Sequence, residues 1–332
     1  MTQPKLLLLS PAFHGYWKAI QASLEVHGYD VRTHIYDAPG TLSERILNKL
    51  AHELPEKYRP ESFAAQATRK AIGAFNGFRP DIVLVIKGDM LSREWWDLLE
   101  TSGVRYGTWL YDEMRRMSYT EEDLHHLGAL ASYSPLDAQH LREQGFEVLD
   151  MPNAYDTHCP VVPMREDSIN FVGAKYPNRE ETLQALVSAG LPVRAYGRAW
   201  SRHLYDILRT KQFKNSGVPA GRDIDRSEAY GIMASSPATL NIHNNQDGFT
   251  MRTFEAPGVG ALQVIDRPDV DRYYIPGEEV LVYESIDELI EICTRIFRDP
   301  KWARKIREAG QKRTLAEHTF DQRVKILEQL WA

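Results

Sequence analysis

Residues 241–266, NIHNNQDGFTMRTFEAPGVGALQVID, carry the clearest fold signal in the chain. An apolar strand is expected at 238–242, and a polar, glycine-bearing loop separates it from a helix expected at 252–258. Two glycines then allow a close turn into another apolar strand at 262–265. Strand, helix and strand in immediate succession are typical of a parallel sheet covered by helices, so this stretch predicts an α/β fold.

The same alternation extends in both directions along the chain. Continuous apolar runs such as IVLVI at 82–86 predict strands that are buried on both faces, as in parallel sheets. In the first half, strands are expected at 5–10, 31–36, 82–86, 105–111, 129–134 and 147–151, and helices at 16–27, 42–75 and 92–101. In the second half, further strands are expected at 169–172, 193–196 and 280–283, and further helices at 179–189, 228–234, 286–297, 300–317 and 320–331.

The length of the chain predicts two domains. At 332 residues it exceeds the roughly 250–300 residues at which a single hydrophobic core stops growing. The proline-rich segment THCPVVPMREDS at 157–168 is not expected to continue a sheet, so we interpret it as a connector. We expect Rossmann-like, doubly wound domains at 1–153 and 154–319. We expect the two domains to face a central cleft. The ligand site is expected at this cleft, because such sheets bind ligands at the carboxyl ends of their strands.

Composition excludes several classes of protein. Hydrophobic residues at 43% and charged residues at 26% are typical of a folded globular chain. With 40 basic and 46 acidic residues the net charge is −6. This overall charge predicts binding neither to nucleic acid nor to an anionic membrane surface. Residues 1–150 hold 16 of the basic and 21 of the acidic side chains, so an anionic ligand is expected on the second half.

Cysteines and apolar runs bear on location. Cys159 and Cys293 stand far apart without a CxxC pattern, which argues against a disulfide framework or a zinc site and favours a reduced, cytoplasmic setting. The four leucines at 6–9 are too short a run for a signal-peptide core or for the roughly 20 residues of a membrane span. We therefore expect no membrane span.

The loop before the helix at 252–258 is a candidate phosphate site. Gly248 lies in this loop, and a helix amino terminus beside it offers free backbone N–H groups and the positive end of the helix dipole. Asp247 and Glu255 are eight positions apart, so a helical turn between them would let both carboxylates face one pocket and accept hydrogen bonds from ligand hydroxyls. The alternative is a surface loop with a capping aspartate before an ordinary helix.

Motifs of other enzyme classes are absent. The sequence has no Walker loop, no GxGxxG after a strand, no HExxH and no GxSxG, so kinase, dehydrogenase, zinc-protease and hydrolase chemistry lack their parts. Asp223 and Asp225 formally match a D-x-D pattern, but they lie in a Gly/Arg-rich loop, and we interpret them as the start of a helix. The expected chemistry is therefore metal-independent and uses no cofactor.

The segment DGFTMRTFEAPGVGALQVID at 247–266 resembles the donor-binding signature of GT-B glycosyltransferases, and in particular the CgeB-like (spore maturation protein) group related to retaining family-4-type enzymes. Further stretches agree in order with this family. They are PDIVLVIKGD at 80–89, YGTWLYDE at 106–113, FVGAKYPNREETLQAL at 171–186 and VRAYGRAW at 193–200. The resemblance implies a GT-B fold with an acceptor-side domain at 1–153, a donor domain at 154–319, and a last helix at 320–332 that crosses back to the first domain.

The resemblance also implies residue roles. In this family two glutamates separated by seven residues touch the donor, and the matching positions here are Asp247, one methylene shorter, near the sugar and Glu255 at the ribose. Candidates to neutralise the diphosphate as negative charge develops on the leaving group are Arg198 and Arg252, followed by Lys175. The donor-binding residues are expected to be Glu255, Gly248, Phe249, Thr250, Arg252, Arg198, Lys175, Gly173, Gly197 and His243.

Four polar positions follow predicted strands. His14 is a candidate to contact the acceptor or the donor phosphate, or it is a surface histidine. Asp112 is a candidate base or acceptor-positioning group, or a turn aspartate. Lys87–Asp89 could line the acceptor side, or form a solvated loop. His243 could lie near the sugar, or be a histidine satisfied by neighbouring amides. Together with Asp247, His14 and Asp112 form the expected catalytic set.

The resemblance implies a glycosyltransferase, a hexosyl- or pentosyltransferase, that moves a sugar from a nucleoside-diphosphate donor such as a UDP-sugar to an acceptor hydroxyl with retention of configuration. A glycan, a protein, a small molecule or modified DNA would all serve as acceptor. The alternatives are a GT-B sugar-nucleotide epimerase or hydrolase and a non-catalytic nucleotide-sugar-binding protein.

Overall fold

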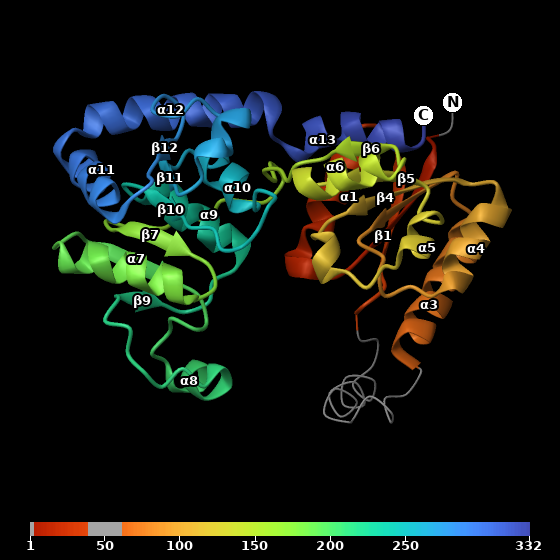
Figure 1. The fold of residues 1–332 in the computed structure, drawn as a ribbon, viewed down its shortest axis with the longest axis horizontal. Helices are drawn as coiled ribbons and strands as arrows, with labels where there is room; N and C mark the ends of the chain where they lie inside the picture. The colour runs from red at the N-terminus through yellow and green to blue at the C-terminus, as the bar shows by residue number, and fades with distance from the viewer. Residues whose placement is uncertain (1–2, 39–61) are drawn as a thin grey trace. The chain divides into compact units, whose positions relative to one another are not determined.

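The computed structural model describes residues 3–38 and 62–332, which fold into two compact units (Figure 1). The first unit contains Met1–Pro152 together with Phe320–Ala332, and the second contains Asn153–Thr319. The helix expected at 42–75 falls largely outside the described residues, and the part that is described is a helix that begins at Ser62.

The first unit is built on a parallel sheet of six described strands in the order β2-β1-β3-β4-β5-β6. The order reverses between β1 and β3, which makes the sheet doubly wound and places the loops after these two strands at a topological switch point. The strands are β1 (Lys5–Ser10), β2 (Asp30–Ile35), β3 (Ile82–Ile86), β4 (Arg105–Leu110), β5 (Ala129–Ser132) and β6 (Val148–Asp150).

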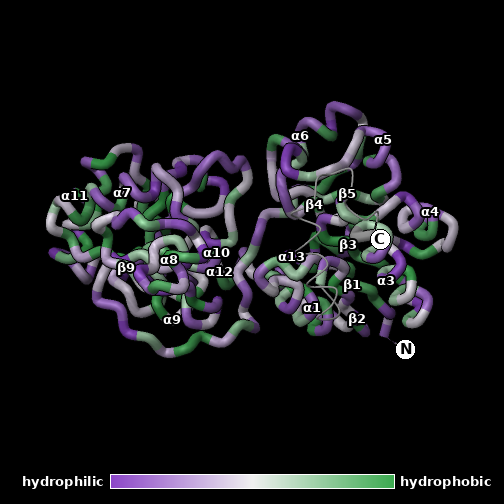
Figure 2. The backbone as a smooth tube through the Cα atoms, turned by 90° about the horizontal axis from the view of Figure 1, so that it is seen from below, coloured by the Kyte–Doolittle hydropathy of each residue, from purple (hydrophilic) through white to green (hydrophobic). Residues whose placement is uncertain are grey.

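Helices cover both faces of this sheet because its central strands are apolar throughout. Leu7 and Leu9 of β1 pack with the helices α3 and α4, where the rings of Phe75 and Trp95 meet edge to face at 6.1 Å. Figure 2 shows hydrophobic stretches in the interior of the unit and more hydrophilic segments around them. The helices are α1 (Trp17–Val26), α3 (Ser62–Phe78), α4 (Arg93–Ser102), α5 (Glu121–Leu124) and α6 (Pro135–Glu143).

The end of the chain packs on the first unit. Helix α13 (Phe320–Leu327) lies beside α1, and the short turn η5 (Glu328–Leu330) reaches β4 and β5. Trp331 donates its indole N–H to the Tyr29 hydroxyl at 3.2 Å, and Arg105 donates to the Trp331 carbonyl at 3.0 Å. Gly107 of β4 makes room for η5, because a Cβ at this position would lie 2.7 Å from Leu330 Cβ.

The second unit is built on another parallel sheet of six described strands in the order β12-β11-β10-β7-β8-β9. Here the order reverses between β7 and β10. The strands are β7 (Ile169–Val172), β8 (Val193–Tyr196), β9 (Ala220–Gly221), β10 (Thr239–Asn241), β11 (Gln263–Ile265) and β12 (Leu281–Val282). The doubly wound α/β architecture expected from the sequence is therefore confirmed.

The second unit has six helices. Asp225 begins α9 as a capping box, because its carboxylate accepts from the Glu228 N–H at 2.9 Å, so the helix start expected at 223–225 is confirmed. Helix α8 and strand β9 were not expected, since neither has a long apolar pattern. The helices are α7 (Pro177–Ser188), α8 (Leu204–Thr210), α9 (Arg226–Ser235), α10 (Arg252–Gly258), α11 (Ile286–Arg298) and α12 (Pro300–Glu317).

The interpretation of the proline-rich segment 157–168 as a connector between domains is wrong. The segment belongs to the second unit and packs along α9, where Val162 N–H donates to the Ser227 carbonyl at 3.1 Å. A Cβ on Gly231 would lie 1.8 Å from the Val162 carbonyl oxygen, so this close approach requires glycine in α9. Proline keeps the segment out of a sheet without making it a linker.

Replacing Trp331 by alanine is expected to destabilise the first unit by about 3–5 kcal/mol, because a buried aromatic ring leaves a cavity. Calorimetry of the full chain should show the unfolding of the first unit moving to a lower temperature, as a shifted transition or as one that separates from the unfolding of the second unit. The control is Leu315→Ala, a half-exposed leucine on α12. An unchanged melting profile for Trp331→Ala would contradict the packing of the last residues on this unit.

Candidate functional site

In the second unit, the switch point between β7 and β10 is held by a buried arginine. Arg179 on α7 donates from Nε to the Ile242 carbonyl at 2.8 Å and from an Nη atom to the Ala174 carbonyl at 3.0 Å. Beside it, Asn178 donates to the His243 carbonyl at 2.8 Å. Burial lowers the pKa of Arg179. The loop after β7 and the end of β10 are thus fixed to each other through one helix.

Gly173 and Gly197 bring the ends of β7 and β8 into backbone contact. Gly173 N–H donates to the Tyr196 carbonyl at 3.0 Å, and Trp200 donates its indole N–H to the Gly173 carbonyl at 3.0 Å. Gly197 has a φ of 149°, and a Cβ there would lie only 2.6 Å from the Gly173 oxygen. Glycine is required at 197, and the paired loops leave backbone without side chains at this edge.

His243 and Asp266 form a pair at the ends of β10 and β11. Asp266 accepts from His243 Nδ1 at 2.8 Å through one oxygen and from the His243 backbone N–H at 2.8 Å through the other. A carboxylate can only accept, so a proton sits on Nδ1, and in the neutral ring Nε2 is an acceptor. Nε2 is buried and has no protein partner among the described residues. The sequence predicted His243 but missed Asp266, although Asp266 directly follows a strand.

Arg267 fixes the loop that contains Asp247 and Gly248. Its guanidinium donates to the Gln246 carbonyl at 2.9 Å and to the Asp247 carbonyl at 3.0 Å. It also donates to Asp269 at 2.6 Å, a hydrogen bond that raises the pKa of Arg267. The guanidinium stacks 4.4 Å from the centre of the Phe249 ring. Arg267 was not predicted, and its position just after β11 was the available signal.

Phe249 and Thr250 end the loop that precedes α10, and they make different contacts. The Phe249 side chain is buried in the core, in edge-to-face contact with His243 at 5.6 Å between ring centres. Its carbonyl accepts from Asn153 Nδ2 at 2.8 Å, and the Thr250 carbonyl accepts from Thr253 N–H at 3.0 Å. The loop therefore presents backbone rather than the Phe249 ring.

Arg252 and Glu255 form an ion pair within α10. Arg252 donates to Glu255 Oε2 at 2.9 Å, and Tyr230 on α9 donates to Oε1 at 3.1 Å. Glu255 is 1% exposed, whereas the Arg252 side chain is 21% exposed. The guanidinium is therefore the more accessible member of the pair. Tyr230 is a further site residue that the sequence analysis did not single out.

The other predicted cations already have acidic partners. Lys175 pairs with Glu180 at 2.9 Å, and Arg198 pairs with Asp223 at 2.8 Å. Asp223 therefore binds a cation of the protein, while Asp225 caps α9. The structure brings the Gly173 and Gly197 loops together, and it brings His243 next to the Phe249 loop.

The first unit gathers charge at the carboxyl ends of β3 and β4. Lys87 Nζ lies 3.2 Å from Asp112 and 3.7 Å from Asp89. Lys87 and Gly88 both have left-handed backbone, with φ of 63° and 79°, which is strained for Lys87 and ordinary for glycine; such strain is common at functional sites. Tyr119 fixes this turn by donating to the Lys87 carbonyl at 2.6 Å. Asp112 thus belongs to an organised cluster with Lys87 and Asp89.

His14 lies in the loop after β1. It is exposed and has a φ of 46°, and its neighbour Phe13 meets the ring of Tyr111 edge to face at 6.1 Å. Tyr111 immediately precedes Asp112, so the two predicted residues of this unit sit on loops that touch. Asp247, the third residue of the expected catalytic set, belongs to the second unit.

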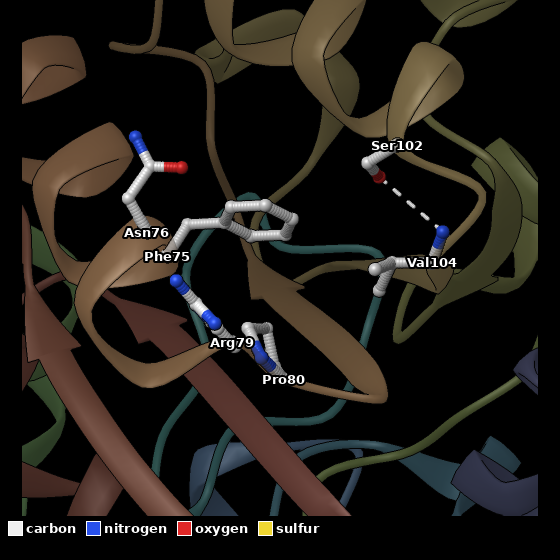
Figure 3. Close-up of a pocket in the computed structure, with 6 residues that line it drawn as sticks. All are labelled: Phe75, Asn76, Arg79, Pro80, Ser102 and Val104. Carbon is white, nitrogen blue, oxygen red and sulfur yellow. Dashed lines mark hydrogen bonds between the residues drawn. The ribbon is translucent and has the colours of Figure 1, made fainter.

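A pocket of about 450 Å³ in the first unit lies away from these residues (Figure 3). It is formed by the last turns of α3 and α4 and by the turns that precede β3 and β4, where Val104 N–H donates to Ser102 Oγ at 3.3 Å. These turns are at the amino ends of the strands, opposite the loops described above. The pocket contains none of the predicted site residues.

The described residues contain neither a cluster of metal ligands nor a helix that could span a membrane. Within 3–38 and 62–332, no three His, Cys, Asp or Glu side chains gather in a way that would hold a metal ion. No helix in the described part of the chain combines the length and the apolar character needed to cross a bilayer. Cys159 and Cys293 are free thiols.

Comparison with known proteins identifies a domain type. Residues 179–329 match the family model described as "Glycosyl transferase-like". Spore protein CgeB of Bacillus subtilis (strain 168) is 21% identical over 265 residues, which cover 74% of this chain and 81% of that protein.

Solved structures show the fold. A glycosyltransferase from Rickettsia africae superposes with a TM-score of 0.67 at 12% identity, covering 99% of this chain and 98% of the other. Anabaena HepE in complex with UDP-glucose gives 0.63 at 13% identity, covering 98% of both chains. The chain therefore has the GT-B fold of these neighbours, and its residues 179–329 match a glycosyl transferase-like family model.

Proposed function

We propose that this chain is a glycosyltransferase that moves a sugar from a nucleoside-diphosphate donor to an acceptor hydroxyl. The observation that carries the proposal is the set of groups at the carboxyl end of the second sheet: two glycine loops, an acceptor nitrogen on His243 and the partly exposed cation of Arg252. The GT-B neighbour HepE, whose structure holds UDP-glucose, supports a UDP-sugar as the donor.

Each group has a chemical task in donor binding. The glycine loops let a phosphate approach the backbone closely, and Arg252 supplies positive charge where the leaving group becomes negative. Glu255 orients Arg252, and in the role implied by the family it accepts from the ribose hydroxyls. His243 Nε2, held by Asp266, accepts from a donor hydroxyl. In the role that the family resemblance implies, Asp247 contacts the donor sugar.

We propose a retaining, metal-independent hexosyl or pentosyl transfer. As the glycosidic bond to the diphosphate breaks, the acceptor oxygen bonds to the anomeric carbon and its proton passes to a phosphate oxygen of the leaving group. The protein then mainly binds and orients the two substrates. On the acceptor side, His14 and the Lys87–Asp112 pair position the hydroxyl. Cytoplasmic location is part of the same proposal.

Replacing Glu255 by glutamine is expected to weaken binding of UDP or GDP by roughly 1.5–3 kcal/mol, the worth of a hydrogen bond to a charged group. Arg252→Gln should weaken the diphosphate more than the free nucleoside, since it removes charge. Isothermal titration calorimetry measures both. The matched control is Glu317→Gln, an exposed glutamate that also pairs with an arginine of its own helix.

Unchanged affinity of Glu255→Gln and Arg252→Gln for both nucleotides would remove α10 from the donor site.

Product analysis separates the transferase from the epimerase. Incubation of the wild type with a UDP-sugar alone should give no epimer, and an epimer formed without acceptor would replace the transferase proposal with an epimerase.

Transferase activity is expected to survive an excess of EDTA, because Asp223 and Asp225 are engaged with Arg198 and with the α9 amino terminus. Sugar transfer assayed before and after chelation measures this directly. Complete loss that Mn²⁺ or Mg²⁺ restores would contradict the metal-independent mechanism.

Asp89→Asn is expected to stabilise the first unit at neutral pH. Burial is the largest influence on Asp89 and raises its pKa, and one of its carboxylate oxygens is buried without a partner among the described residues. A raised carboxyl pKa costs folding free energy as pH rises from about 4 through the folded value. The gain in melting temperature should therefore be full at pH 7–8 and vanish below about pH 4.

Asp97→Asn on α4 is the control for this pH series, because it removes the charge of an exposed carboxylate and not of a buried one. A lower melting temperature of Asp89→Asn at pH 7 would show instead that Asp89 stabilises the turn. The stabilised variant should lose transfer activity if the Lys87 cluster positions the acceptor.

A further inference from the structure

Helix α8 and the loop after it expose large apolar side chains. Leu204, Tyr205, Leu208 and Phe213 are 76%, 58%, 70% and 67% exposed. In Figure 1, α8 stands away from the sheet of the second unit. Isolated exposed apolar residues are ordinary on protein surfaces, but four within ten positions of one segment form a patch. We call residues 202–214 the α8 segment.

The α8 segment is also basic. Arg202, Arg209, Lys211 and Lys214 are exposed, and within the described residues no ion pair engages them. The acid of the segment, Asp206, points inward, where Arg222 Nε donates to it at 2.9 Å and Ser201 Oγ at 2.7 Å. The outer surface therefore combines apolar side chains with uncompensated cations.

The fold holds this surface in place. These hydrogen bonds lower the pKa of Asp206 to about 2, so the anchor of α8 stays ionised at any pH near neutrality. At the other end of the segment, Gln184 on α7 donates to the Ser216 carbonyl at 2.7 Å. The apolar side chains are exposed by a fixed helix, not by a frayed end.

The size and charge of the patch indicate which kind of partner it binds. A helix of seven residues is about 10 Å long, whereas a stable protein interface buries roughly 800 Å² on each side, so a second copy gains too little here. Mixed basic and apolar side chains match an anionic bilayer, whose headgroups attract lysine and arginine while leucine and phenylalanine enter the acyl boundary. We propose that the α8 segment binds the surface of a lipid bilayer with anionic headgroups.

The test is flotation of the full chain with unilamellar vesicles. Vesicles of equal phosphatidylglycerol and phosphatidylcholine should carry the protein, and vesicles of phosphatidylcholine alone should not. Raising the salt concentration should weaken binding, since the Debye length shortens. Inorganic phosphate at constant ionic strength should not displace the protein, because a bilayer and not a free anion is the ligand.

Two double variants separate the two contributions. Lys211→Gln with Lys214→Gln should weaken vesicle binding by roughly 25-fold, about fivefold for each charge at the surface. Leu208→Ser with Phe213→Ser should weaken it by at least about tenfold through lost apolar insertion. The matched controls are Lys301→Gln with Lys305→Gln on α12, and Leu136→Ser on α6, whose leucine is also exposed. These controls should bind as the wild type does.

Equal binding to both kinds of vesicle, or unchanged binding of the two α8 double variants, would overturn the proposal. Displacement by inorganic phosphate would reduce it to a simple anion site. A dimer in light scattering that Leu208→Ser with Phe213→Ser converts to monomer would assign the patch to a second copy instead. UDP affinity of the variants is measured in parallel, so failure here is distinguishable from failure of the proposed activity.

Discussion

The buried guanidinium of Arg179 is the interaction on which the candidate site of the second unit depends. It satisfies carbonyls on both sides of the switch point, one from the loop after β7 and one from the end of β10. A lysine could not replace it, because two carbonyls in different directions need the planar fork of arginine. With both strand ends fixed by α7, the Gly173 loop and His243 keep one spacing, and the site is preorganised.

The two units share one feature at the switch points of their sheets. Each sheet reverses beside its switch point, and each has there a buried polar atom that lacks a partner among the described residues: an Asp89 oxygen after β3 and Nε2 of His243 after β10. Such atoms cost stability unless a ligand satisfies them. The strands that lead to them are apolar and well packed, so the core compensates for this cost.

Sequence reasoning was accurate where a signal was local. IVLVI at 82–86 became β3, and the Asp225 cap followed from neighbouring residues alone. It was less complete where interacting residues are distant in sequence, because no residue near His243 indicates that its partner is Asp266. The burial of Glu255 depends on Tyr230 from another helix, and α8 is too short for a periodic pattern. A proline-rich composition showed that 157–168 is not a strand but could not show what it packs against.

The chain passes between the units twice, at Pro152–Asn153 and at Thr319–Phe320. On one side of these passages Tyr155 N–H donates to the His318 carbonyl at 2.8 Å, and on the other Arg323 donates to the Pro152 carbonyl at 2.9 Å. The two passages of the chain are therefore tied to each other by one hydrogen bond within each unit. Gly258 of α10 packs against the Tyr155 ring, where a Cβ would lie 2.3 Å away. The segment after the first passage is thus packed directly on the helix that carries Arg252 and Glu255.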